Sequence, residues 1–230
     1  MMRVAIFEHA PYEGPGAIAT WAEARGHAVM RIDATLGAFP EPAEYDFLVV
    51  MGGPMSANDD ATLDWLAAEK RAVRAGIDAG KCVLGVCLGG QIVASVLGAA
   101  ITRNPELEIG WFPVTLSRAA RESRVFQALP ESFISGHWHG DTFAVPEGAT
   151  AMASSAACAN QAFEYDNGRV VGVQFHLEWF SADVEALAEA CGADVVPAQH
   201  VVDIDTFVAG ERQHGAVCRA HMHALLDALA

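Results

Sequence analysis

Basic side chains are scarce in this chain. Its 230 residues contain 14 lysines and arginines against 29 aspartates and glutamates, which gives a formal net charge of −15. Such an excess of negative charge repels phosphate backbones and anionic lipid headgroups. We therefore expect neither nucleic acid nor a membrane surface as a partner. The chain also lacks an apolar run of about eighteen residues that could span a bilayer.

Targeting and disulfide signals are missing too. The acidic Glu8 follows the first apolar residues too soon for the apolar region of a signal peptide. The five cysteines are odd in number, widely spaced and without a Cys-x-x-Cys pair, which argues against a disulfide framework or a zinc ribbon. We expect a cytoplasmic protein with reduced thiols, one of which is present for its chemistry.

The composition and the element pattern predict a folded α/β protein. Hydrophobic residues make up 52% of the chain, too many for a disordered one. Apolar runs alternate with helical patterns in the first hundred residues, which is typical of a parallel sheet; the expected strands are 3–7, 27–32, 45–51 and 82–86. Further strands with little helix between them follow, and the last fifty residues return to helical patterns, notably 182–190 and 216–229. No repeat or linker divides the chain, so we predict one domain over residues 1–230.

Cys87 is the first candidate catalytic residue. It lies where an apolar strand runs into a short glycine-rich turn and then into a helix. Such a turn lifts the side chain above the sheet and places the sulfur at a helix N-terminus, which favours the thiolate. The alternative is a buried structural cysteine beside a glycine turn, because free cysteines are usually buried.

His176 and Glu178 follow a second apolar strand, 170–175. Residues two apart in an extended chain point to the same side. His176 could therefore face Cys87 while Glu178 orients the imidazole, which is the arrangement of nucleophile, base and orienting group in a catalytic triad. Taken alone, the pair could equally be an ordinary strand end at the surface.

These segments resemble the signatures of the class I, triad-type glutamine amidotransferases. Within that family, the chain is similar to the amidotransferase domain of GMP synthases. Five motifs occur in the order of that family: 51–56, 85–91, 108–111, 137–141 and 174–178. The resemblance implies a three-layer, flavodoxin-like α/β fold. In it a mostly parallel sheet carries helices on both faces and an added antiparallel strand region.

The resemblance also implies roles for individual residues. Cys87 would attack the side-chain amide of glutamine, His176 would transfer protons, and Glu178 would orient His176. The backbone N–H groups of Gly53 and Leu88 would form the oxyanion hole. The substrate would be bound by Gln91 and by a loop that contains Trp138, His139 and Gly140. Leu177 stands where many family members have proline, which spares both of its catalytic neighbours.

Three functions remain open. One is a glutamine amidotransferase or glutaminase that supplies ammonia to an acceptor or a separate synthase. Another is a hydrolase of γ-glutamyl amides or peptides. The loops 9–16 and 56–60 would determine which substrate is bound. The third is a non-catalytic thiol sensor or regulator. We expect no cofactor and no metal: His137 and His139 could be metal ligands, but the sequence shows no third.

Overall fold

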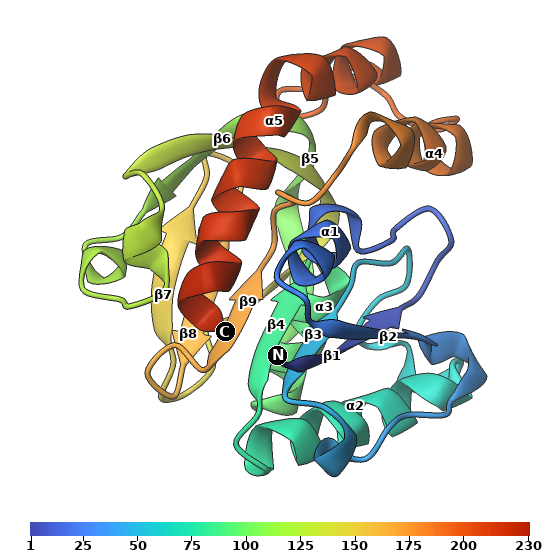
Figure 1. Cartoon of the computed structure of the whole chain (residues 1–230). Coiled ribbons are helices and arrows are strands. Elements are labelled where there is room, and N and C mark those ends of the chain that lie inside the picture. The colour runs from blue at the N-terminus through green and yellow to red at the C-terminus, as the bar shows by residue number, and fades with distance from the viewer.

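The computed structural model describes all residues, 1–230, and its elements are shown in Figure 1. The five α-helices are α1 (Gly16–Ala24), α2 (Asp64–Asp78), α3 (Leu88–Val96), α4 (Ser181–Cys191) and α5 (Ile204–Leu229). The strands are β1 (Arg3–Glu8), β2 (Ala28–Asp33), β3 (Phe47–Val50), β4 (Cys82–Val86), β5 (Ile101–Leu116), β6 (Ser132–Phe143), β7 (Thr150–Ser154), β8 (Ala162–Tyr165) and β9 (Val170–Val173). No helix is long and apolar enough to cross a membrane.

All strands belong to one nine-stranded sheet in the order β2-β1-β3-β4-β9-β8-β7-β5-β6. The pairs from β2 through β9 are parallel, and those from β9 through β6 are antiparallel. The parallel part thus has the strand order of flavodoxin-like folds, in which ligands bind beyond the carboxyl ends of the strands. The predicted fold class, including the antiparallel addition, is confirmed.

Two cores cover the two faces of the parallel strands. Successive residues of β1 and β3 alternate between them: Ile6 and Val49 pack with α1 and α5, whereas Phe7 and Val50 pack with α2 and α3. Both faces are apolar because helices cover both, and this explains why the strands appear in the sequence as continuous apolar runs. A third, smaller core joins α4 to the beginning of α5.

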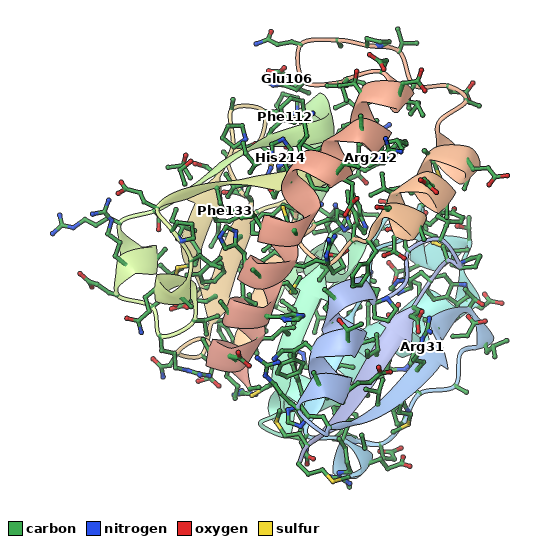
Figure 2. The ribbon with its side chains drawn as sticks, turned by 45° about the horizontal axis from the view of Figure 1, so that its top comes forward. Arg31, Glu106, Phe112, Phe133, Arg212 and His214 are labelled. Carbon is green, nitrogen blue, oxygen red and sulfur yellow. The ribbon has the colours of Figure 1, made fainter.

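Helix α5 is longer than its pattern suggested. The sequence predicted a helix over 216–229, but α5 begins at Ile204, where the side chain of Asp203 accepts a hydrogen bond of 2.8 Å from the Thr206 N–H. Gly210 obscured this beginning because glycine is a poor helix former. In the structure a Cβ at Gly210 would overlap the Trp111 ring, so this glycine allows the helix to lie against β5. Figure 2 shows the helix, with His214 labelled, beside Phe133 of β6.

Helix α3 packs with its backbone directly against the sheet. A Cβ at Gly89 would overlap the carbonyl oxygen of Val50 in β3, and a Cβ at Gly90 would lie 2.7 Å from that of Val173 in β9. Only residues without a side chain permit so close an approach. The start of α3 is therefore fixed relative to the carboxyl ends of the strands on either side of β4.

Replacing Gly89 by alanine tests this packing. We expect Gly89→Ala to lower the free energy of unfolding by about 1–3 kcal/mol, because the added methyl group must displace backbone rather than a flexible side chain. For a chain of this length, the melting temperature should fall by about 2–4 °C per kcal/mol.

Gly14→Ala is the matched control, since a Cβ there meets its nearest atoms at 3.7 and 3.8 Å, an ordinary contact distance. Thermal and urea denaturation of both variants measures the difference. Equal stabilities would contradict the tight packing of α3.

Candidate active site

Cys87 lies between the end of β4 and the first residue of α3. Its φ of 53° and ψ of −110° place a non-glycine residue in the left-handed half of backbone space. Such strain persists only where surrounding structure enforces it, and it is common at functional sites. The Cys87 N–H donates a 2.8 Å hydrogen bond to the carbonyl of Val173, which links the turn to β9. The predicted sharp turn is present.

The sulfur of Cys87 lies in a polar environment that several segments form. It is 3.5 Å from Nε2 of Gln174 and 3.8 Å from the carbonyl oxygen of Trp138. The side chain is only 5% exposed, yet it lines a cavity of about 510 Å³. A buried nucleophile that still reaches a cavity can meet a small molecule with little competing water.

His176 and Glu178 form a buried pair beside this cysteine. Nδ1 of His176 is 2.6 Å from Oε1 of Glu178, and the Leu177 N–H donates to the second carboxylate oxygen at 3.0 Å. The Trp179 ring stacks on the imidazole with centroids 3.9 Å apart and 15° between planes. Hydrogen bonding and stacking thus fix the ring orientation, as an acid/base residue requires.

The charge state of His176 follows from these contacts. Burial alone would lower the pKa of the ring, but the attraction of Glu178 and hydrogen bonds with Cys87 and Glu178 outweigh it and raise the pKa to about 10. The imidazole is therefore protonated at neutral pH. It can stabilise a negative charge on the neighbouring sulfur.

Two of the backbone N–H groups that line the cavity without an acceptor in the protein lie just after β3 and β4. They belong to Gly53, which follows β3, and to Leu88, the first residue of α3. The N-terminus of a helix also carries a partial positive charge. These two donors suit an anionic oxygen beside Cys87.

The four residues predicted to bind substrate all line the same cavity. Three of them, however, lie in a strand and not in the expected loop. Trp138, His139 and Gly140 belong to strand β6, opposite a register shift in β5. Gln91 already donates its amide hydrogens to the side-chain oxygen of Gln174 at 3.1 Å and to the carbonyl of Asp141 at 3.2 Å. Only its carbonyl oxygen remains for a ligand.

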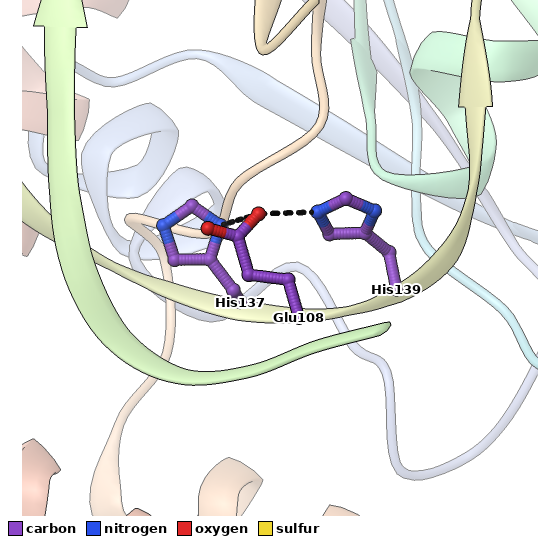
Figure 3. A group of neighbouring side chains, drawn as sticks. All are labelled: Glu108, His137 and His139. Carbon is purple, nitrogen blue, oxygen red and sulfur yellow. Dashed lines mark hydrogen bonds and ion pairs between the residues drawn. The ribbon is translucent and has the colours of Figure 1, made fainter. Parts of the chain in front are cut away.

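His139 belongs to a buried cluster that Figure 3 shows. Its Nε2 is 2.9 Å from Oε2 of Glu108 in β5, and Nδ1 of His137 lies 3.4 Å from the same oxygen. Hydrogen bonds from the two histidines outweigh the effect of burial and lower the pKa of Glu108. Nδ1 of His139 bonds the carbonyl of Asp141 at 3.0 Å, so neither ring nitrogen is free for a substrate.

This cluster supplies the third ligand type that the sequence did not reveal. Two imidazoles and a carboxylate, from Glu108, His137 and His139, form a donor set that could hold a zinc or iron ion. In the structure they contact one another directly at hydrogen-bond and ion-pair distances, and Gln161 donates to Glu108 at 2.7 Å. The cluster holds the strand that carries Trp138 against β5.

The sequence pattern of the family "Glutamine amidotransferase class-I" matches residues 23–190. The chain belongs to the class I glutamine amidotransferase family. It is 34% identical over 203 residues to the glutamine amidotransferase-like protein YfeJ of Salmonella typhimurium, covering 86% of this chain and 84% of that one. It is 33% identical over 132 residues to the GMP synthase [glutamine-hydrolyzing] of Streptomyces avermitilis, where the match covers 57% of this chain and 23% of that enzyme.

Solved structures of amidotransferases have the same fold. A glutamine amidotransferase from Thermotoga maritima superimposes with a TM-score of 0.89 at 27% identity and covers 99% of this chain and 97% of its own. One from Methylobacillus flagellatus gives 0.88 at 28% identity, with 99% and 93% covered. The match extends over nearly the whole of this family member, well beyond its five motifs.

Sequence reasoning missed one acidic residue of this amidotransferase site. Glu13, in the loop after β1, lines the cavity and forms no side-chain hydrogen bond, although it is only 8% exposed. Burial raises its pKa, opposed in part by His176 and His9. A Cβ at Gly52 would overlap its carboxylate and lie 3.4 Å from Cε1 of His176. The carboxyl group thus lies beside the catalytic candidates, and no motif marked it.

Sequence reasoning also missed a pair of buried residues, His9 and Glu69, next to Gly52. His9, also in the loop after β1, contacts Glu69 of α2, and both side chains are fully buried. Glu69 falls three residues after Leu66 and four before Val73, within the apolar stripe of its helix. An acidic residue at such a position was the available signal, because a buried carboxylate requires a partner.

The role of Glu178 can be tested through the titration of His176. We expect Glu178→Gln to lower the pKa of His176 from about 10 towards its ordinary value of 6.5, because the attracting charge is removed while burial remains. NMR titration of the ring nitrogens measures this directly. Glu185→Gln, an exposed change on α4, is the control.

Stability should follow the same linkage. With a raised folded pKa, the stabilising charge on His176 is fully present below about pH 6.5 and is lost as the pH rises through about 10. The wild type should lose this contribution across that interval, whereas Glu178→Gln should show little of the loss. An unchanged His176 titration in the variant would contradict the pairing.

Proposed function

We propose that this protein hydrolyses the side-chain amide of L-glutamine through a cysteinyl thioester and releases ammonia for an acceptor or a partner synthase. The observation that carries the proposal is the position of Cys87. It lines one cavity with Gly53 and Leu88, whose backbone N–H groups have no protein acceptor, and it neighbours the His176 imidazole that Glu178 holds. The similarity to glutamine-hydrolyzing GMP synthases supports the same reaction.

The reaction begins with attack of the Cys87 thiolate on the amide carbon of glutamine. The carbonyl π electrons move to oxygen and give a tetrahedral oxyanion. His176 then donates its proton to the nitrogen, the carbon–nitrogen bond breaks, and ammonia leaves a glutamyl thioester. His176, now neutral, takes a proton from water, and the hydroxide attacks the thioester carbon. The carbon–sulfur bond breaks, glutamate is released, and the Cys87 thiolate and the protonated His176 are regenerated.

The oxyanion is stabilised by the N–H groups of Gly53 and Leu88. Neither group has an acceptor within the protein, so no internal hydrogen bond has to break for it to donate to the oxyanion. Removal of one such donor in comparable sites lowers kcat by about 10²–10³-fold. The N-terminus of α3 adds its partial positive charge at the same place.

Substrate recognition uses the cavity wall formed by β6 and α3. Gln91 offers its carbonyl oxygen, while Trp138, His139 and Gly140 act through main-chain atoms, since the His139 ring is bonded at both nitrogens. Glu13 offers carboxylate oxygens without a protein partner to hydrogen-bond donors of the substrate.

The size of the cavity favours a second candidate, a larger γ-glutamyl amide or peptide. The ten non-hydrogen atoms of glutamine need no more than about 300 Å³ if each takes the share of a water molecule, about 30 Å³. The cavity measures about 510 Å³ and is also lined by Ser56 and Asp59, from the loop expected to select the substrate. The same thioester chemistry applies, with an amine as the leaving group.

We place either reaction in the cytoplasm, in keeping with five free thiols.

The proposed nucleophile is tested by Cys87→Ala. We expect ammonia release from glutamine, or amine release from γ-glutamyl compounds, to fall by about 10⁴-fold or more, because no covalent intermediate can form. Coupled glutamate and ammonia assays measure it. Circular dichroism and thermal melting should show that the fold persists.

Cys82→Ala is the matched control, five residues earlier and bonded through its sulfur to the Leu229 carbonyl. It should retain activity. A wild type that converts neither glutamine nor any γ-glutamyl compound, with candidate acceptor proteins present, would refute the proposed function. Activity retained by Cys87→Ala would refute the assignment of the nucleophile.

A further inference from the structure

The peptide between Gly52 and Gly53 has an orientation that matters for the site. The peptide group is planar, and no peptide bond in the chain is cis, so the Gly52 carbonyl and the Gly53 N–H point in opposite directions. Whichever group fixes the carbonyl also determines where the N–H points. The Gly53 N–H has no acceptor in the protein, and Gly53 lines the cavity with Cys87.

His9 is the group that fixes this carbonyl. Its Nδ1 lies 2.9 Å from the Gly52 oxygen, which accepts no backbone hydrogen bond. Its Nε2 lies 2.8 Å from Oε1 of Glu69. Both ring nitrogens therefore face acceptors, and the ring donates to both when it is protonated.

The surroundings of His9 favour that protonated form. Burial would lower the pKa of the ring, but the charge and hydrogen bond of Glu69, the bond to Gly52 and the charge of Glu13 raise it overall. The ring also packs against Trp65 of α2 with centroids 5.7 Å apart. The charged groups facing His9 are thus both carboxylates, one on α2 and one in the loop after β1.

A glycine pair needs such an anchor more than other sequences do. Residues without a Cβ populate both halves of backbone space, so a peptide between two glycines can rotate at little cost. Gly53 cannot be replaced to stiffen it, because a Cβ there would lie 2.8 Å from Cδ2 of Leu88 and 2.9 Å from Cβ of His9. A side-chain hydrogen bond to the carbonyl holds the peptide without adding a side chain at either glycine.

We propose that His9, held by Glu69, is a positioning residue that keeps the Gly52–Gly53 peptide oriented so that the Gly53 N–H faces the oxyanion formed at Cys87. The inference rests on the proposed function, because it assigns how one half of the oxyanion hole is maintained. His9 itself touches neither substrate nor the reacting atoms. The imidazole acts only through the peptide.

The test compares His9→Ala with His9→Asn in the full chain. Alanine removes the bond to the Gly52 carbonyl, and we expect kcat for glutamine, or for the γ-glutamyl substrate found active, to fall by about 10²-fold with KM nearly unchanged. Asparagine can place Nδ2 where the imidazole has Nδ1, so His9→Asn should recover most of kcat. His221→Ala, which removes a partly buried imidazole that packs on Phe133, is the control and should be unaffected.

A second readout separates orientation from general damage. Alkylation of Cys87 by iodoacetamide passes through no oxyanion, so its rate should be the same in wild type and both His9 variants. Wild-type kcat in a folded His9→Ala protein would overturn the proposal. So would an equal loss in the alanine and asparagine variants, or a parallel loss of alkylation.

Failure of the proposed function gives a different result, namely a wild type without turnover of any glutamine or γ-glutamyl substrate. The orientation of the peptide would then be read from crystal structures of wild type and His9→Ala. We expect the Gly52 carbonyl to leave its position in the variant. A carbonyl that keeps its orientation without the imidazole would overturn the inference independently of activity.

Discussion

The direct packing of α3 on the sheet is the constraint on which the site depends. Because glycines replace side chains at this contact, the first turn of the helix lies against the backbone of β3 and β9. Cys87, which precedes the helix, is thereby held above the carboxyl edge of β4, the strand between those two. Gly53 follows one neighbouring strand and His176 follows the other. The proposed nucleophile, oxyanion donors and base converge because three adjacent parallel strands end at the same edge.

Local buried pairs of histidine and carboxylate, rather than the net charge of the molecule, determine the electrostatics of the site. The chain carries a formal charge of −15, yet each key histidine is buried beside a carboxylate. His176 with Glu178, His9 with Glu69 and His139 with Glu108 are three such pairs. Each holds a different part of the site: the proposed base, the carbonyl of the peptide before Gly53, and the strand that carries Trp138. Low exposure keeps these interactions strong, whereas the acidic surface is screened by salt.

The sequence predicted the elements that have a local signature. The parallel strands appear as continuous apolar runs because helices cover both faces, and the residues Cys87, His176 and Glu178 stand in short contiguous motifs. Glu13 and His9 had no such signature, since their partners lie on elements distant in the sequence. The beginning of α5 was missed because Gly210 is a poor helix former. A glycine is needed there because a Cβ would overlap the Trp111 ring. The segment 138–140 was expected in a loop, but Glu108 and the pairing with β5 keep it extended.

Along the chain, the antiparallel strands β5 to β8 come between β4 and β9, and this order has a consequence for folding. These two strands are neighbours in the sheet, yet β5 to β8 separate them along the chain, so their pairing closes a long loop. Contacts of such high sequence separation are slow to form. A chain in which β9 has not yet joined β4 has Cys87 without His176. Its thiol therefore lacks the neighbouring imidazole until β9 pairs with β4.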